Sequence, residues 1–152
     1  MKVKSSFKRV ETEKMHSGEL AFVFKDDVPT LALTVATVEG SQGLLLLEGP
    51  NAGQLENLLH FSHIVLTDPV VVTLPSRGRS SISTKPPKDK ALFVAIDGEE
   101  TFFVFPVNGG EFGMANIATG ELSDFDQSGF YLTQWELWLE DEAAREPLLT
   151  TE

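Results

Sequence analysis

Residues 19–38 read ELAFVFKDDVPTLALTVATV, and this stretch decides the fold class. Apolar side chains alternate along it on both sides of residues 26–29, where Asp, Asp, Val and Pro form a typical turn sequence. A period of two is the pattern of a strand that has one face in the core. We therefore predict two strands, at 19–25 and 30–38, that pair as a hairpin.

A second segment of the same kind lies at 91–107 and reads ALFVAIDGEETFFVFPV. Its Asp-Gly pair at 97–98 favours a hairpin, because both residue types accept a positive φ. Residues 21–30 align without a gap to residues 92–101, an offset of 71, and four of the ten positions are identical. Either an internal duplication of hairpins 20–38 and 91–107 or the chance similarity of two hairpins explains this alignment.

Further short segments rich in β-branched and aromatic residues occur along the chain, and most connections between them are short. Short connections favour antiparallel pairing, because parallel strands need long crossovers. We expect a mainly β (α+β) fold, an antiparallel sandwich or partly open barrel, with one or two short helices at about 52–60 and 134–145. The capping-box form of Asn51 and Gln54 indicates the first helix. Residues 130–139 fit both an alternating strand and a helical stripe, and we favour a strand that enters the second helix.

A chain of 152 residues is most simply one domain, 1–152. Within it we expect a basic arm at 1–18, an exposed loop at 75–90 and a frayed tail at 146–152. The loop reads PSRGRSSISTKPPKDK, and its Ser, Pro, Gly and charged residues are typical of a connection rather than of a core strand.

The absence of cysteine excludes disulfides, zinc–thiolate sites and cysteine nucleophiles. It also fits a reducing compartment. The longest apolar run, the four leucines at 44–47, is far shorter than the roughly 20 residues of a membrane span. We therefore expect a cytoplasmic protein with no membrane partner. No motif indicates a cofactor, and we expect none.

The net charge of −11 is distributed unevenly along the chain. Residues 1–90 contain 11 Lys and Arg against 10 Asp and Glu, whereas residues 91–152 contain one Arg against 13 Asp and Glu. An acidic half of this kind can dock a basic protein surface, imitate a nucleic acid, or only keep the protein soluble. The interaction candidates are Trp135, Trp138, Glu136, Glu140, Asp141, Arg77 and Arg79. Core packing is the alternative for both tryptophans, and we favour it for Trp135.

No catalytic motif frames a serine, a histidine or a carboxylate pair, so the sequence identifies no catalytic residue. Weak metal-ligand candidates are Glu56, His60 and His63, whose spacing would place them on one face of a helix. That spacing matches no established zinc motif, and we predict no metal site.

Three functions follow as hypotheses. The favoured one is a non-catalytic protein-interaction or assembly module, whose partner is another protein or a second copy of the chain. The first alternative is a small enzyme or metal-binding protein whose site is assembled from distant residues. The second is weak nucleic-acid binding through the basic arm and the 77–90 loop, which the acidic remainder of the chain opposes.

Overall fold

The computed structural model describes the chain as strands joined by turns. The described residues are 7–10, 15–37, 39–57, 64–67, 70–73, 82–83, 91–95, 100–106, 112–124, 128–140 and 146–150. Their strands are β1 (Phe7–Val10), β2 (Leu20–Lys25), β3 (Val28–Ala36), β4 (Gln42–Leu46), β5 (Leu55–Asn57), β6 (Ile64–Thr67), β7 (Val70–Thr73), β8 (Ile82–Ser83), β9 (Ala91–Ala95), β10 (Thr101–Pro106), β11 (Phe112–Asn116), β12 (Leu122–Asp124), β13 (Gly129–Leu132), β14 (Glu136–Leu139) and β15 (Leu149–Thr150). No helix occurs within these ranges, and the mainly β fold class is confirmed.

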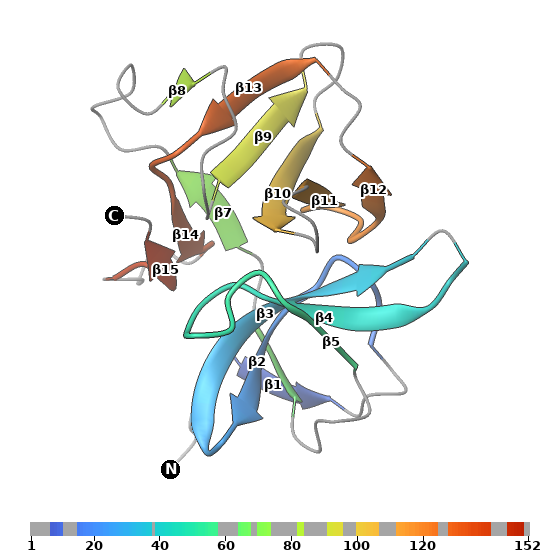
Figure 1. Ribbon diagram of the computed structural model, residues 1–152. Helices are drawn as coiled ribbons and strands as arrows, with labels where there is room; N and C mark the ends of the chain where they lie inside the picture. Colours follow the sequence, from blue (N-terminus) through green and yellow to red (C-terminus); the bar gives the residue numbers. More distant parts are fainter. Residues whose placement is uncertain are drawn as a thin grey trace.

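Two antiparallel sheets pack on each other as a sandwich (Figure 1). In the described part of the chain, sheet 1 has the strand order β1-β6-β2-β3-β4-β5, and sheet 2 has the order β12-β11-β10-β9-β13-β8. A smaller sheet 3, with the order β15-β14-β7, joins the middle of the chain to its C-terminal strands. Both predicted hairpins are confirmed, since β2 pairs with β3 and β9 pairs with β10.

Sheets 1 and 2 share one connectivity. In each sheet, the strand that comes last in the sequence lies between the first and the second: β6 between β1 and β2, and β13 between β8 and β9. The second to fifth strands then form a meander. The hairpins also share a register, because every residue pair of β9–β10 corresponds to a pair of β2–β3 at the same offset of 71. A duplicated chain would have both features. Equivalent residues nevertheless face opposite ways, since Leu31 points between the sheets and Phe102 points outward, and duplication stays a hypothesis.

The main core lies between sheets 1 and 2. Alternate residues of β3 and β4 contact alternate residues of β9, β10 and β11 there. Residues of β13, of the segment between β13 and β14, and of sheet 3 complete the cluster. Its buried members are Leu31, Leu33, Val35, Leu45, Leu47, Leu92, Phe103, Phe105, Ala115, Leu132, Trp135, Leu137 and Leu149. Complete burial of one Leu or Phe side chain contributes about 2 kcal/mol, so this layer is the main force that holds the sheets together.

The helix predicted at about 52–60 is wrong in the part that the structure describes. Residues 49–54 form a tight turn instead, in which Gly53 has a φ of 85° and donates its N–H to Leu46 O at 2.7 Å. The chain then returns beside β4 as β5. A glycine inside a helix costs about 1 kcal/mol relative to alanine. Pairing of β5 with β4 gives the backbone groups of residues 55–57 hydrogen-bond partners without that cost. Residues 58–60 lie outside the described residues.

The helix predicted at 134–145 is also wrong where it is described, because residues 136–139 form β14. Trp135 and Leu137 are buried while Glu136 and Trp138 are partly buried, which is the alternation of a strand. β7 and β15 pair with the two edges of β14 and satisfy its backbone groups, so tertiary pairing overrides the helical stripe. Residues 141–145 lie outside the described residues.

Three segments that we expected to be irregular contain strands. Phe7–Val10, within the basic arm expected at 1–18, form β1 and pair with β6. Leu149–Thr150, within the tail expected to be frayed at 146–152, form β15, and Leu149 is buried because it joins the main core. Ile82–Ser83 form β8 beside β13. The remainder of the loop expected at 75–90 lies outside the described residues.

The end of β3 connects the two sheets. Its ladder with β2 stops at Leu20↔Leu33, although β3 continues to Ala36. There the Ala36 N–H donates to Gly120 O at 2.9 Å, and Ala36 forms an isolated parallel bridge with Glu121. Gly120 belongs to the turn between β11 and β12 of sheet 2. We call the contact between residues 16–19, 34–36 and 118–121 the seam.

Thr34 completes the seam on the side of sheet 1. Its N–H donates to Glu19 O at 2.9 Å, and its carbonyl accepts from Gly18 N–H at 2.7 Å. Its hydroxyl accepts from Glu19 N–H at 2.8 Å and donates to His16 O. The Thr34 side chain is only 2% exposed, and these bonds supply its polar atoms with the partners that burial requires.

The seam needs glycine at two positions. A Cβ at Gly120 would lie 2.3 Å from Thr34 O and 2.4 Å from Gly18 N, and a Cβ at Gly18 would lie 2.5 Å from Ala118 O. Both glycines also have a positive φ, of +71° and +87°. The left-handed backbone and the close approach of two chains therefore select glycine together.

Gly120→Ala should lower the free energy of unfolding by about 3 kcal/mol, because backbone strain and overlap with the Thr34 carbonyl act together. Gly40→Ala is the matched control. Gly40 also has a positive φ, +84°, but a Cβ there meets nothing within 4 Å, and we expect a loss of about 1 kcal/mol. Urea unfolding measures both losses, and equal losses would contradict a close approach at the seam.

Candidate functional site

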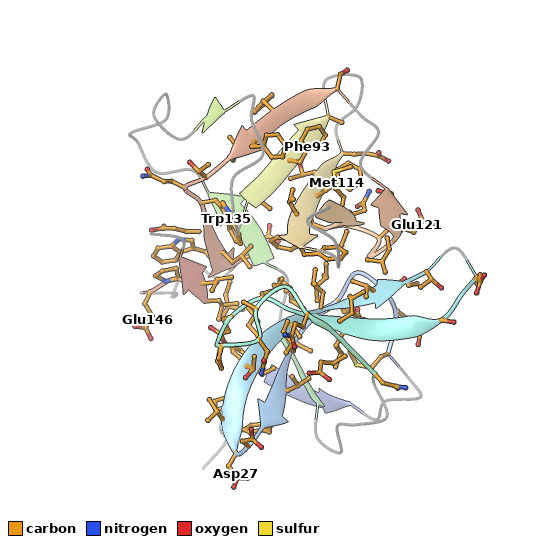
Figure 2. The ribbon with its side chains drawn as sticks, viewed as in Figure 1. Asp27, Phe93, Met114, Glu121, Trp135 and Glu146 are labelled. Atoms are coloured by element: carbon orange, nitrogen blue, oxygen red, sulfur yellow. The ribbon has the colours of Figure 1, made fainter. Side chains whose placement is uncertain are left out.

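A cleft of about 350 Å³ opens beside the seam, where the end of β3 approaches one end of sheet 2. Figure 2 shows Glu121 beside β12, near the place where the two sheets meet. The residues that line the cleft are Thr37, Glu100, Phe102, Asn116, Glu121, Leu122 and Ser123. All except Thr37 belong to sheet 2 and its turns.

Strand pairing places Phe102, Asn116 and Glu121 in one row across sheet 2, and Ser123 in the next row on the same face. Phe102 of β10 lies opposite Asn116 of β11, and the Asn116 N–H donates to Glu121 O at 2.9 Å. Ser123 of β12 lies opposite Met114, which is buried in the cluster on the outer face of the sheet. Side chains of alternate residues share a face, so the row runs along this outer face from β10 to β12.

The side chain of Asn116 has a fixed orientation. Its Oδ1 accepts from the backbone N–H groups of Ala118 and Thr119, at 2.9 and 3.2 Å, and so caps the turn that carries Gly120. An oxygen that accepts two N–H groups leaves the amide nitrogen Nδ2 at the opposite position. Within the described part of the chain, Nδ2 makes no hydrogen bond. Asn116 is only 7% exposed, yet Nδ2 is not one of the fully buried atoms without a partner, so this unused donor is accessible from the cleft that the residue lines.

Ser123 supplies a second unused polar group. Its hydroxyl oxygen is buried and has no hydrogen-bond partner among the described residues. Buried polar groups are hydrogen-bonded in the great majority of cases, so an exception calls for an explanation such as a bound ligand or water.

Carboxylates flank these donors. Glu100 precedes β10 and Glu121 precedes β12, so they lie on either side of β11, which ends at Asn116. Both glutamates are exposed. None of the seven residues that line the cleft is basic, and the site is therefore electronegative. It combines carboxylate acceptors with amide and hydroxyl donors.

Sequence reasoning missed this row. The only local signal was the position of Asn116 just before the turn-like sequence Ala-Thr-Gly at 118–120, because asparagine often caps a following turn. Glu100 follows the Asp-Gly pair of the predicted hairpin and Glu121 follows Gly120, and carboxylates near turns are usually solvated. Their common position depends on strand register and on the approach of sheet 1, neither of which one sequence reveals.

The interaction candidates on β14 do not form one exposed surface. Trp135 is 2% exposed and packs on Phe103, with ring centroids 5.3 Å apart, as its predicted core role requires (Figure 2). Trp138 is partly buried, and its Nε1 donates to Glu136 Oε2 at 2.8 Å. Glu140 is exposed at the end of the strand. Asp141, Arg77 and Arg79 lie outside the described residues.

The metal candidates lose their geometric basis. Glu56 belongs to β5, so the helix face that would have carried it with His60 and His63 is absent at that residue. His60 and His63 themselves lie outside the described residues. Over the described ranges, no group of three or more His, Cys, Asp or Glu side chains is placed to hold a metal ion.

A second cleft, of about 380 Å³, lies near the turn between β2 and β3. Apolar side chains predominate in it, with Asp26 and Glu48 as its carboxylates. Glu48 Oε1 already accepts from the Leu31 N–H at 2.8 Å, where it takes the place of a backbone acceptor for β3. We therefore consider the cleft at the seam the better candidate.

One titratable group in the outer cluster of sheet 2 has a perturbed acidity. Burial raises the pKa of Tyr131, whose ring packs on Phe93 with centroids 5.2 Å apart. The phenol, which is neutral at physiological pH in any case, therefore stays neutral to a higher pH than an exposed tyrosine. This residue is not among those that line either cleft.

No protein-family model matches the chain, and no curated protein or solved structure matches it either. Within the described ranges, the structure contains no helix with the length and apolar character that a membrane span requires.

Asn116→Ala should lower the free energy of unfolding by about 2 kcal/mol, because the N–H groups of Ala118 and Thr119 lose their acceptor. Asn116→Asp keeps an oxygen at the position of Oδ1 and should lower the free energy of unfolding by clearly less than Asn116→Ala. Urea unfolding at neutral pH compares the two variants. If the Asp variant is as unstable as the Ala variant, capping of this turn is not the role of Asn116.

Proposed function

We propose that this chain is a non-catalytic protein-interaction or assembly module that binds a basic surface of another protein or of a second copy. The observation that carries the proposal is the electronegative cleft at the seam, in which the carboxylates of Glu100 and Glu121 flank the fixed amide of Asn116. A basic partner supplies the charge that this set of groups lacks.

The charge of the whole chain supports the same proposal. The 13 Asp and Glu residues of segment 91–152, against one Arg, give this half of the chain a strongly negative charge. Such a charge accelerates the encounter with a positive surface and disfavours acidic partners. A nucleic acid is thereby disfavoured as well. The proposal includes a cytoplasmic location, which the absence of cysteine favours.

The same groups suit recognition better than catalysis. Among the described residues, the cleft is lined by no histidine, cysteine or lysine, the side chains that most often act as bases or nucleophiles near neutral pH. Its polar groups are oriented by the turn and the strand register, which is the property that a binding site needs.

A fluorescent peptide of ten residues that alternates glycine and arginine tests this function, with fluorescence anisotropy as the readout. We expect the wild-type chain to bind it in about 50 mM salt and to release it in about 500 mM salt, because screening weakens attraction between exposed charges. The Glu100→Gln/Glu121→Gln variant should bind about tenfold more weakly, as expected when two exposed charge pairs are lost.

Glu146→Gln is the matched control, since Glu146 is an exposed carboxylate of the same acidic half that does not line the cleft. It should change the affinity by less than about twofold. Light scattering of the chain alone over the same salt range tests assembly with a second copy. The proposed function is wrong if the peptide does not bind and the chain does not self-associate at low salt.

A further inference from the structure

We infer that the cleft at the seam binds a single arginine residue of an extended partner segment, through its guanidinium group and an adjoining main-chain carbonyl together. This inference rests on the proposed function and specifies the chemistry of the partner. Its basis is that one cleft contains both unused donors and free acceptors.

The donor side determines that a carbonyl is bound. Asn116 is nine-tenths buried, its Oδ1 is occupied by two backbone N–H groups, and its Nδ2 is left without an acceptor among the described residues. Nδ2 is not one of the fully buried atoms without a partner, so it is open to solvent in the cleft and can donate to a ligand oxygen placed there. Every peptide segment offers main-chain carbonyls, whereas a free inorganic cation offers no acceptor at all.

The acceptor side determines that a cation is bound beside that carbonyl. Glu100 and Glu121 reach the cleft from the two sides of β11, and none of the described residues that line the cleft is basic. A guanidinium group presents five N–H donors in a planar fork and can therefore engage two separate carboxylates. An ammonium group concentrates its three donors at one point and matches this arrangement less well.

The size of the cleft limits how much of the partner it accepts. A volume of about 350 Å³ is at the lower end of the range for small-ligand pockets, which is about 300–1,000 Å³. One side chain with its adjoining peptide unit suits that space, and the rest of the partner segment would remain outside it. The side chains that line the cleft stand on three neighbouring strands, so a ligand can bind them without any change in the backbone of sheet 2.

Three small probes separate these contributions. The first is N-acetyl-glycyl-arginyl-glycine amide, the second is the same peptide with lysine in place of arginine, and the third is methylguanidine, which has no carbonyl. Titrations followed by NMR of the full chain give each dissociation constant. We expect the arginine peptide to bind about fivefold more tightly than either other probe, as one additional hydrogen bond predicts.

Two variants assign the affinities to residues. Glu100→Gln/Glu121→Gln should weaken both guanidinium probes about tenfold. Asn116→Asp keeps the turn acceptor but loses the Nδ2 donor, so it should remove the preference for the arginine peptide over methylguanidine. Glu146→Gln should leave all three dissociation constants unchanged.

The inference is wrong if the lysine peptide binds as well as the arginine peptide, if methylguanidine binds as well as the arginine peptide to the wild type, or if Asn116→Asp retains the preference. It is also wrong if none of the probes binds. If the ten-residue basic peptide still binds in a salt-dependent way in that case, the proposed function survives and only the arginine site fails. Loss of both would overturn both.

Discussion

The hydrogen bonds at the end of β3 are the constraint on which the rest of the structure depends. β3 extends beyond the end of its ladder with β2, so the backbone groups of its last residues on that edge need other partners. Gly18, Glu19 and Gly120 supply them. The Ala36 to Gly120 bond joins the two sheets directly through the backbone, and the pairing of β7 with β14 in sheet 3 links the strands that follow each of them. Packing supplies most of the energy, whereas these directional bonds position one sheet against the other.

The same turn that joins the sheets also builds the cleft. Asn116 caps the turn with Oδ1, Gly120 provides its left-handed residue and its contact with β3, and Glu121 follows directly. A small displacement of this turn would move the Asn116 amide and the Glu121 carboxylate together. Stability and recognition are thus coupled in a stretch of six residues, 116–121. The proposed arginine site inherits its rigidity from the contact that holds the sandwich together.

Local patterns allowed both hairpins and their strands to be predicted, because alternation and the turn residues near 26 and 97 are short-range signals. Both predicted helices failed where described. Gly53 and the pairing of β5 with β4 decide one case, and the pairing of β14 with β7 decides the other. The cleft was beyond prediction, because it requires the register of β10, β11 and β12 and the approach of Ala36. Those are long-range facts that propensity and periodicity do not contain.

The proposed arginine site depends most directly on the Nδ2 amide group of Asn116. The side-chain NH₂ signals of this residue can be followed by NMR in an ¹⁵N-labelled chain. Titration with the acetylated arginine peptide should shift these signals strongly and saturably, with smaller shifts at the backbone amides of Glu100 and Glu121. The amide of Ala36, which is held at the seam, should shift little. Shifts that leave the Asn116 side chain unchanged and gather elsewhere on the chain would contradict the account.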